Sequence, residues 1–270
     1  MTRRPLVILL LIAGAVFALG PLLWMVSASL MAAGDASSTP PPILPRTATL
    51  EQYRVLIDRL ALGGYLFNSA VTAISATLLS LFINSLAGYA FAKLRFAGRD
   101  RLFGGLAGLL VVPAQVGMLP LFLLLRELGV INTYLGVIIP WMASVLGIFM
   151  VRQYALSIPD DLLDAARLDG ASEFRIYRSV VLPVISPILV TLAIYTFLGS
   201  WNDFLWPLIV LSDDRWYTLP VALAGLSGEY VQDVELMMAG AVVTVLPVLL
   251  VFLALQRYYI QGIMQGSVKG

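Results

Sequence analysis

Residues 152–183 read RQYALSIPDDLLDAARLDGASEFRIYRSVVLP, a polar stretch that follows the apolar run 134–151 and leads into the apolar run 182–211. An apolar run of about 20 residues is long enough to cross the hydrocarbon layer of a membrane as a helix. The chain has 270 residues, of which 60% are apolar and 12% are charged, so its apolar runs need lipid around them. The quoted stretch is therefore predicted to be a loop at the surface of a helical membrane protein.

Outward from this loop, the sequence predicts an all-α membrane protein with six transmembrane helices. The runs are Leu6–Leu30, Leu66–Ala92, Leu102–Leu125, Tyr134–Val151, Leu182 to about Leu211, and Leu236–Leu255. Trp201, Asn202, Asp203 and Pro207 interrupt the fifth run, which favours a span followed by a kinked extension. The first run is too long for the apolar part of a signal peptide, so we expect it to be retained. Residues 1–64 then form the first span and an outer loop, and residues 65–270 form a five-helix core with the loop 152–181.

The positions of lysine and arginine predict the orientation, because these residues concentrate on the cytoplasmic side of a membrane protein. With the N-terminus inside, twelve of them are cytoplasmic and five are outside. The cytoplasmic set is Arg3, Arg4, Lys93, Arg95, Arg99, Arg101, Arg152, Arg167, Arg175, Arg178, Arg257 and Lys269, and the outer set is Arg46, Arg54, Arg59, Arg126 and Arg215. We therefore expect a bacterial inner (plasma) membrane protein with both termini in the cytoplasm.

Two stretches are expected outside the membrane under this topology. Residues 33–64 contain a proline-rich turn segment and then, from Thr49, a short amphipathic helix. Residues 213–235 carry five acidic side chains and a single arginine. Such an acidic segment suits docking of a soluble partner, and it equally suits a solvated loop.

Composition also excludes several classes of function. The chain has no cysteine and no histidine, which removes disulfides, thiolate metal sites and histidine-based acid/base catalysis. A net charge of +1 is unlike that of a nucleic-acid-binding protein. There is no phosphate-binding G-x-x-x-x-G-K-[ST] motif, so we expect no enzyme activity and no bound cofactor or metal in this chain.

Within the loop, the spacing predicts a short helix, a glycine turn and a second short helix. Ser157 is placed to cap the first helix, Gly170 to end it, and Ser172 to cap the second. The expected apolar faces are Leu162, Leu163 and Ala166 on the first helix, and Phe174, Tyr177 and Val181 on the second. Two interpretations remain open on these grounds: the apolar faces contact a partner protein, or the loop is a tight connector packed on its own helices.

The loop resembles a motif of ABC importer permeases, E-A-A-x-x-x-G followed after nine residues by I-x-L-P. The corresponding residues are Asp164-Ala-Ala-Arg-Leu-Asp-Gly170 and, nine residues later, Val180-Val-Leu-Pro183. Asp164 stands where the motif has glutamate. The resemblance implies a coupling helix seated in a cytoplasmic ATPase subunit. The coupling residues would be Asp161, Leu162, Asp164, Ala165, Ala166, Asp169, Gly170, Ala171 and Phe174.

Three further segments resemble the carbohydrate (maltose-type, binding-protein-dependent) branch of that family. They are the second span with its continuation to Gly98, the segment Ser200–Leu208, and the tail Gln256–Gly270. Gly88 and Lys93 replace the alanine and arginine of the family pattern. The resemblance implies a homologous second permease, two copies of an ATP-binding subunit that uses the ATP, and an extracytoplasmic solute-binding protein. The chain would move a sugar inward by alternating access.

Other readings of the function remain open at this point. The transported solute could be a non-sugar such as a glycerophosphodiester or an amino acid. A secondary transporter is a further alternative, although it needs ion-coupling charges within the spans, for which only Asp203 is a candidate.

Polar groups within the spans are candidates for the substrate path, because they are costly there without a role. These residues are Asn84, Trp201, Asn202 and Asp203. An aromatic face with amide and carboxylate groups suits a sugar, which presents C–H surface and hydroxyls. The alternatives are that Asn84 bonds one helix to another, and that the partner permease holds the substrate.

The topology can be tested by introducing single cysteines, since the chain has none of its own. Cysteines at Ser172 and Ser267 should react with an impermeant thiol reagent only from the cytoplasmic side, and a cysteine at Ser227 only from outside. Labelling at Ser172 from outside would overturn the orientation.

Overall fold

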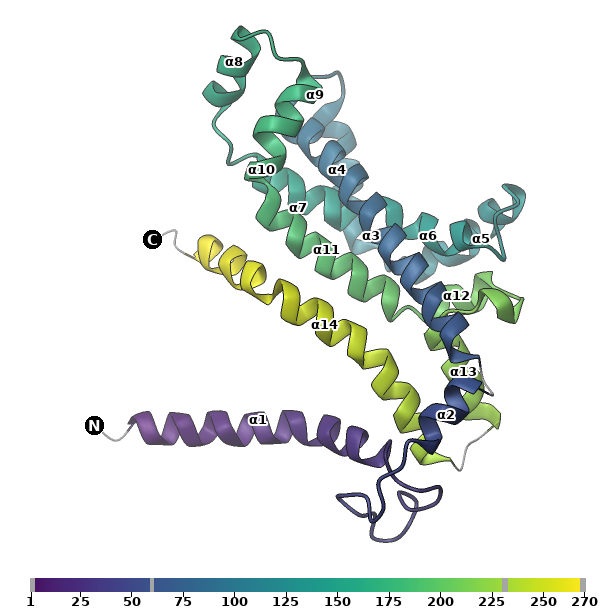
Figure 1. Cartoon of the computed structure of the whole chain (residues 1–270). Coiled ribbons are helices and arrows are strands. Elements are labelled where there is room, and N and C mark those ends of the chain that lie inside the picture. The colour runs from purple at the N-terminus through teal and green to yellow at the C-terminus, as the bar shows by residue number, and fades with distance from the viewer. Residues whose placement is uncertain (1–2, 59–60, 230–232, 268–270) are drawn as a thin grey trace. The chain divides into compact units, whose positions relative to one another are not determined.

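The computed structural model describes residues 3–58, 61–229 and 233–267, without the side chains of 3, 226–229, 255 and 257–267. Every regular element in these ranges is a helix or a helical turn, which confirms the all-α fold (Figure 1). The side chains of the C-terminal tail from Arg257 lie outside the described residues, as do Arg59, Lys269 and the side chain proposed for labelling at Ser227.

Among the residues that the structure describes, four helices are long and apolar enough to cross a membrane: Arg4–Ala28, Leu62–Lys93, Tyr134–Ala155 and Val234–Ala254. Two bent pairs raise the count to six if each pair is one span. The pairs are Arg99–Val111 with Ala114–Glu127, bent by 105°, and Glu173–Val184 with Ser186–Trp201, bent by 79°. The structure is therefore consistent with six spans, two of which are not straight.

The third predicted run, Leu102–Leu125, is not one continuous helix. It consists of α4 (Arg99–Gly108), two short 3₁₀ turns (Leu109–Val111 and Ala114–Gly117) and α5 (Met118–Glu127). Val112 is extended, with φ −82° and ψ 122°. Pro113 follows it, and a proline disfavours the helical conformation of the preceding residue, which explains the break at this point.

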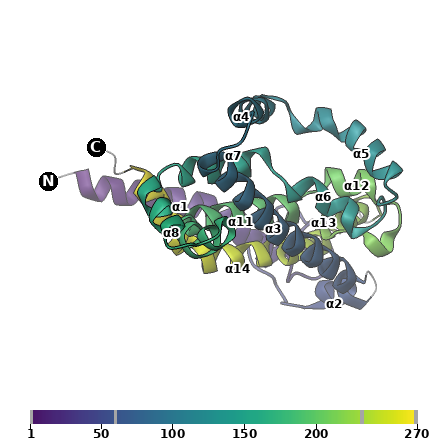
Figure 2. The same cartoon turned by 90° about the horizontal axis from the view of Figure 1, so that it is seen from above.

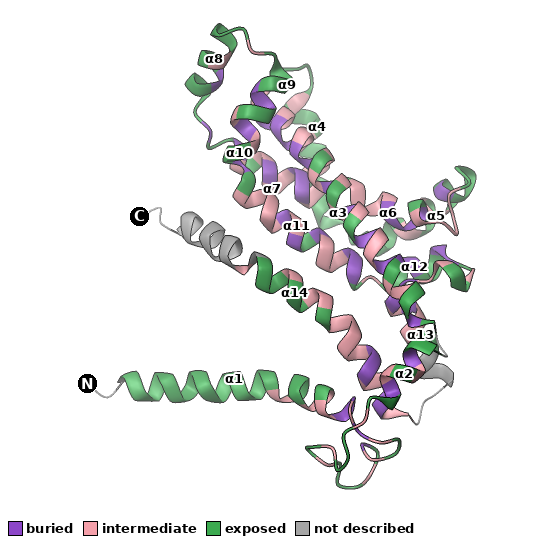
Figure 3. Ribbon diagram, viewed as in Figure 1, coloured by how far each residue is buried: buried purple, intermediate pink, exposed green. Residues whose placement is uncertain are grey.

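The chain divides into two compact units, Met1–Leu66 with Leu219–Pro247, and Phe67–Thr218 with Val248–Gly270. The first unit contains α1 (Arg3–Ala28), α2 (Glu51–Asp58), α13 (Leu219–Glu229) and the first part of α14 (Val234–Ser267). Figure 3 shows α1 exposed along nearly its whole length, as expected for a helix that contacts lipid. The predicted amphipathic helix after Thr49 is α2, and the Thr49 hydroxyl accepts a hydrogen bond from the Glu51 N–H at 3.1 Å.

The segment 213–235 is not simply an acidic loop, because it contains α13 and uses several of its carboxylates within the protein. Asp213 pairs with Arg215 at 2.6 Å, and this arginine lowers the pKa of Asp213 to about 2. Asp233 accepts a hydrogen bond from the Leu236 N–H, at the start of α14. Glu235 is fully buried and accepts a hydrogen bond from the Ala36 N–H at 2.6 Å. Three of the five carboxylates of this segment therefore have partners within the protein.

The second unit is built around α3 (Leu62–Lys93). Its other helices are α4, α5, α6 (Tyr134–Met142), α7 (Val145–Ala155), α8 (Asp160–Leu168), α9 (Glu173–Ile176), α10 (Leu182–Val184), α11 (Ser186–Trp201), α12 (Leu205–Val210) and the part of α14 from Val248, with a π-helical turn at Tyr177–Val181. In both views α3 lies beside α11 (Figures 1 and 2). The predicted kinked extension of the fifth span is confirmed, because α11 ends at Trp201 and α12 follows after a short non-helical break.

One face of α3 carries buried polar side chains that bond to other helices. Near its start, the Asn68 amide donates to the carbonyls of Arg215 and Tyr217 at 2.9 Å each and accepts from the Tyr134 hydroxyl at 2.6 Å. In its middle, Ser80 bonds to Thr196 of α11 at 3.2 Å. Hydrogen bonds between helices are worth on the order of 1 kcal/mol each in a membrane, so these contacts hold the helices in register.

The fourth predicted span is interrupted between α6 and α7. Ala143 and Ser144 are extended, with φ −131° and −99°, so the backbone groups around them lack helical partners. Asn84 of α3 compensates: its side-chain oxygen accepts from the Ser144 N–H at 3.0 Å, and its nitrogen donates to Ser80 at 2.7 Å. The Ser144 hydroxyl in turn accepts from the Gly147 N–H at 3.0 Å and caps α7.

A second backbone group in α6 is satisfied from a distant part of the chain. Pro140 has no N–H to donate to the Gly136 carbonyl, four residues earlier. The buried indole N–H of Trp206, on α12, donates to that carbonyl at 2.9 Å instead. The proline is thus accommodated inside the helix by a contact between α6 and α12.

We predict that Asn84→Leu destabilises the protein, because it leaves the Ser144 N–H and the Ser80 hydroxyl without their amide partner. The expected cost is about 1–3 kcal/mol, read as a lower midpoint of thermal unfolding for the purified protein. Asn202→Leu is the matched control, since the Asn202 side chain is exposed and donates to the Leu198 carbonyl, four residues earlier in the sequence. Equal midpoints for the two variants would show that Asn84 does not support the break.

Candidate functional site

The predicted coupling loop folds as two short helices around a turn. The first, α8, begins after Pro159, whose φ and ψ are −60° and 134°. The Ser157 hydroxyl donates back to the Tyr154 carbonyl at 2.7 Å and is not the cap of this helix, so that prediction is wrong. Asp160 and Asp161 lie in the first turn, where the helix dipole favours negative charge.

The two other local predictions for the loop are confirmed. Gly170 has a φ of +79°, in the left-handed region that favours glycine, and it ends the first helix. The Ser172 hydroxyl accepts a hydrogen bond from the Arg175 N–H at 3.4 Å and caps α9. The sequence could specify these features because both depend only on neighbouring residues.

The apolar side chains of the loop do not share one face as predicted. Leu163 is buried in the core of the second unit, and Ala166 packs against the same core. Leu162 is 46% exposed, and Leu168 is 89% exposed. Adjacent helical residues lie about 100° apart, so the protein core takes Leu163 and leaves Leu162 outside.

The second predicted face is divided in the same way. Tyr177 and Val181 are buried, whereas Phe174 is 62% exposed. The inward side chains belong to the same cluster as Leu163 and Ile176. One side of the loop thus packs on the chain itself, as the connector interpretation predicts, and the other side is open. The contact with a partner protein stays a prediction.

The remaining predicted coupling residues lie on the open side or beside the turn. On α8 the exposed side chains recur at helical spacing and define what we call the outer face of α8. Its members are Asp161, Leu162, Ala165, Leu168 and Asp169. Asp164 lies at the edge of this face, and Ala171 packs against the core.

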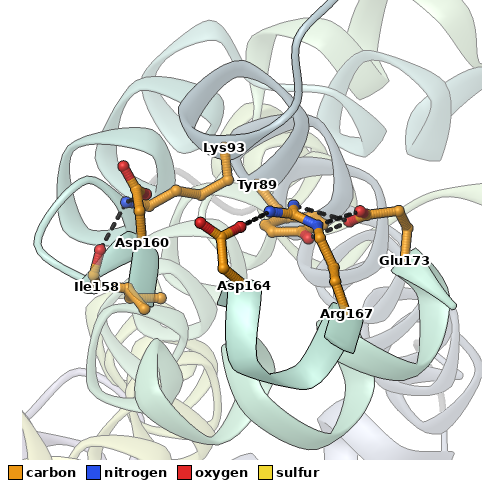
Figure 4. Close-up of polar contacts among 7 residues, drawn as sticks. All are labelled: Tyr89, Lys93, Ile158, Asp160, Asp164, Arg167 and Glu173. Atoms are coloured by element: carbon orange, nitrogen blue, oxygen red, sulfur yellow. Dashed lines mark hydrogen bonds and ion pairs between the residues drawn. The ribbon is translucent and has the colours of Figure 1, made fainter. Parts of the chain in front are cut away.

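The C-terminal end of α3 holds the start of α8 (Figure 4). The Lys93 ammonium donates to the Ile158 carbonyl at 2.6 Å and to the Asp160 carboxylate at 2.7 Å. The hydrogen bond from Lys93 holds the pKa of Asp160 below its usual value. The Lys93 side chain is almost buried, so the surrounding protein fixes its ammonium group. The Asp160 side chain is exposed, and the Lys93 ammonium fixes its carboxylate.

A second set of contacts joins α8 to α9 and again to α3. Arg167 bonds to Asp164 at 2.7 Å and to Glu173 at 2.8 Å, so its guanidinium bridges the two short helices. The Tyr89 hydroxyl of α3 donates to the other oxygen of Glu173 at 2.7 Å. These two carboxylates raise the pKa of Arg167, and the arginine stays charged at any physiological pH. The loop is therefore fastened to α3 at both of its helices.

The loop continues into the fifth span through the π-helical turn Tyr177–Val181 and α10. The Tyr177 hydroxyl bonds to Ser85 of α3 at 2.6 Å. π-helical turns are rare and are often found at functional sites. The connection between loop and span is thus a tight polar contact beside an irregular helix.

The structure separates the four residues predicted for the substrate path. Asn84 is fully buried and supports the break between α6 and α7. Trp201 is 3% exposed and stacks on Phe197, with ring centroids 5.7 Å apart. Asn202 is exposed, and Asp203 is half-buried.

Asp203 contacts Trp141, and not Trp201, the tryptophan that lies near it in the sequence. The Trp141 indole N–H donates to the Asp203 carboxylate at 3.3 Å. Sequence reasoning missed Trp141, because it lies in an apolar run with no polar neighbour and 62 residues away from Asp203. Both residues line a pocket between α5, α6, α7 and α11.

Residues 84–265 match the family described as the binding-protein-dependent transport system inner membrane component. This chain belongs to that family. The match includes α7, the predicted coupling loop and α11. It places the chain in a transport system of the inner membrane that works with a solute-binding protein, and it removes the alternative of a secondary transporter.

Two relatives and one solved structure extend this comparison. The chain is 40% identical over 227 residues to the arabinooligosaccharides transport system permease protein AraQ of Halalkalibacterium halodurans, covering 84% of this chain and 81% of that protein. It is 37% identical to the lactose transport system permease protein LacG of Rhizobium radiobacter, covering 75% and 74%. A chain of a bacterial ABC transporter involved in the import of the acidic polysaccharide alginate superposes with a TM-score of 0.83 at 26% identity, covering 94% and 95%.

These relatives are transport subunits, and the similarity covers most of their length. The predicted family and the predicted helical permease fold are therefore confirmed.

We predict that Arg167→Leu loosens α8, because Asp164 and Glu173 then lose the guanidinium that joins them. Since the side chains are partly exposed, the expected loss is only on the order of 1 kcal/mol. Backbone amides of α8 should exchange hydrogen about fivefold faster in mass spectrometry. Arg175→Leu on α9 is the matched control, since no ion pair of Arg175 is seen within the described residues. Equal exchange in both variants would remove the bridging role of Arg167.

Proposed function

We propose that this chain is the permease subunit of an ATP-driven importer of a carbohydrate. It pairs with a homologous second permease, two copies of a cytoplasmic ATP-binding subunit and an extracytoplasmic solute-binding protein. The observation that carries the proposal is the outer face of α8, an exposed apolar and acidic helix face on a loop that the protein itself holds firmly. ATP is hydrolysed in the ATP-binding subunit. This chain converts the movement of that subunit into opening of the solute path to one side of the membrane or the other.

The contacts of the loop suggest how that movement would travel. A partner that displaces α8 pulls on α3 through Lys93 and, by way of Glu173, through Tyr89. It also pulls on α11 through the turn that contains Tyr177. Because these contacts are short and partly shielded, the loop and the two spans respond together. Alternating access then follows from the tilting of α3 and α11 relative to the partner permease.

The carbohydrate substrate rests on the relatives, whose names give arabinooligosaccharides and lactose. The proposed orientation, with both termini and the loop 152–181 in the cytoplasm, is supported by the lysine and arginine positions.

The proposal predicts that the ATPase can be captured from the outer face of α8 but not from its inner face. In the assembled importer, a cysteine at Ala165, which is exposed, should cross-link to the ATP-binding subunit with a yield that changes when nucleotide is added. A cysteine at the adjacent Ala166, which packs against the core, should not. Capture from neither position, nor from any between Asp161 and Ser172, in an importer that still transports would contradict the coupling role.

The substrate class is tested with the same importer in proteoliposomes. Binding protein loaded with arabinotriose, lactose or an alginate oligosaccharide should stimulate ATP hydrolysis and drive uptake of at least one of these sugars. Glycerophosphocholine and an amino-acid mixture are the comparison solutes. Stimulation by either of these and by no sugar would replace the carbohydrate assignment with the non-sugar alternative.

A further inference from the structure

The pocket between α5, α6, α7 and α11 has a volume of about 540 Å³. This lies within the range of about 300–1,000 Å³ that is usual for small-molecule sites. The residues that give it chemical character are Trp141, Ser144, Tyr195, Asp203 and Trp206. It therefore combines aromatic walls with a few polar groups.

The pocket opens where the fourth span is interrupted. Pro140, Trp141, Ala143, Ser144 and Val145 all line it, so the extended residues between α6 and α7 form part of its wall. Non-helical backbone at membrane depth is tolerated only where it is buried in protein or lines a water-filled cavity. The interrupted backbone, which Asn84 supports from one side, is thus compatible with water or a polar solute in the pocket on its other side.

Asp203 supplies a hydrogen-bond acceptor in this wall. Its carboxylate accepts from the Trp206 N–H at 3.3 Å and from the Trp141 indole N–H at 3.3 Å. A carboxylate has about four acceptor positions, so capacity for a further donor remains. A hydroxyl group in the pocket could fill it.

Two aromatic side chains supply flat apolar surface. Tyr195 is 46% exposed and carries its own hydroxyl. Trp141 lies against the backbone of Gly199, where an added methyl group would collide with the indole ring. Glycine at position 199 therefore leaves room for the Trp141 ring beside Asp203.

We propose that this pocket binds one ring of the transported carbohydrate. The C–H face of the ring packs on Tyr195 and Trp141, and one of its hydroxyls donates to Asp203. This inference rests on the proposed function and adds that the present subunit, rather than only its partner, contacts the substrate. The aromatic contact with the sugar, which the sequence predicted for Trp201, is assigned here to Trp141 and Tyr195, because Trp201 is buried.

The first test measures arabinotriose imported per ATP hydrolysed by the reconstituted importer. Asp203→Asn keeps the shape of the side chain but loses its charge, and Tyr195→Ala removes an aromatic wall. Each should lower the ratio about fivefold, the size expected for one lost hydrogen bond or contact. Phe82→Ala is the matched control, because Phe82 is 57% exposed on α3 and does not line the pocket.

The second test detects occupation directly. In the Ala143→Cys variant, saturating arabinotriose should slow modification by N-ethylmaleimide, and adding Asp203→Asn should abolish this protection. If the wild-type importer transports another of the three sugars instead, both tests use that sugar. If the sugar used is transported while both variants keep the normal ratio and the cysteine is never protected, this inference fails and the proposed function stands. If no sugar is imported by the wild-type protein, the proposed function itself fails.

Discussion

The arrangement of the second unit depends on one constraint: the buried polar groups along α3 must find partners where no water is available. Asn68 is satisfied by Tyr134 and two backbone carbonyls, and Asn84 by Ser80 and the interrupted backbone at Ser144. Lys93 is satisfied by the start of α8. Apart from Ser80, which lies on α3 itself, these partners lie in the fourth span, in the segment after the fifth span and at the start of the loop, so a single helix holds these parts of the second unit.

This constraint connects the two places where function is proposed. The interruption that forms part of the pocket wall is held by Asn84, and the loop that faces the ATPase is held by Tyr89 and Lys93 of the same helix. A movement of α8 relative to the rest of the second unit would break short hydrogen bonds. We therefore infer that α8 and α3 move as one body, and that a displacement at the loop reaches the pocket through α3.

The sequence could predict features that depend on neighbouring residues or on run length. The long apolar runs, the left-handed Gly170 and the Ser172 cap follow from such local signals. It could not predict which side of α8 packs inward, because that depends on the core around Leu163. The contacts of Asn84 with Ser144 and of Trp141 with Asp203 join residues about 60 positions apart, so no local sequence pattern predicts them.

The central claim is that α8 and α3 form one rigid body, and a distance measurement tests it most directly. Spin labels would be placed at Leu168 on α8 and at Phe82 on α3, both exposed, in the otherwise cysteine-free chain. Pulsed electron paramagnetic resonance would be recorded on the assembled importer without nucleotide, with ATP trapped, and after hydrolysis. The account predicts the same narrow distance distribution in all three states, and a shift between them would show that the loop moves independently of α3.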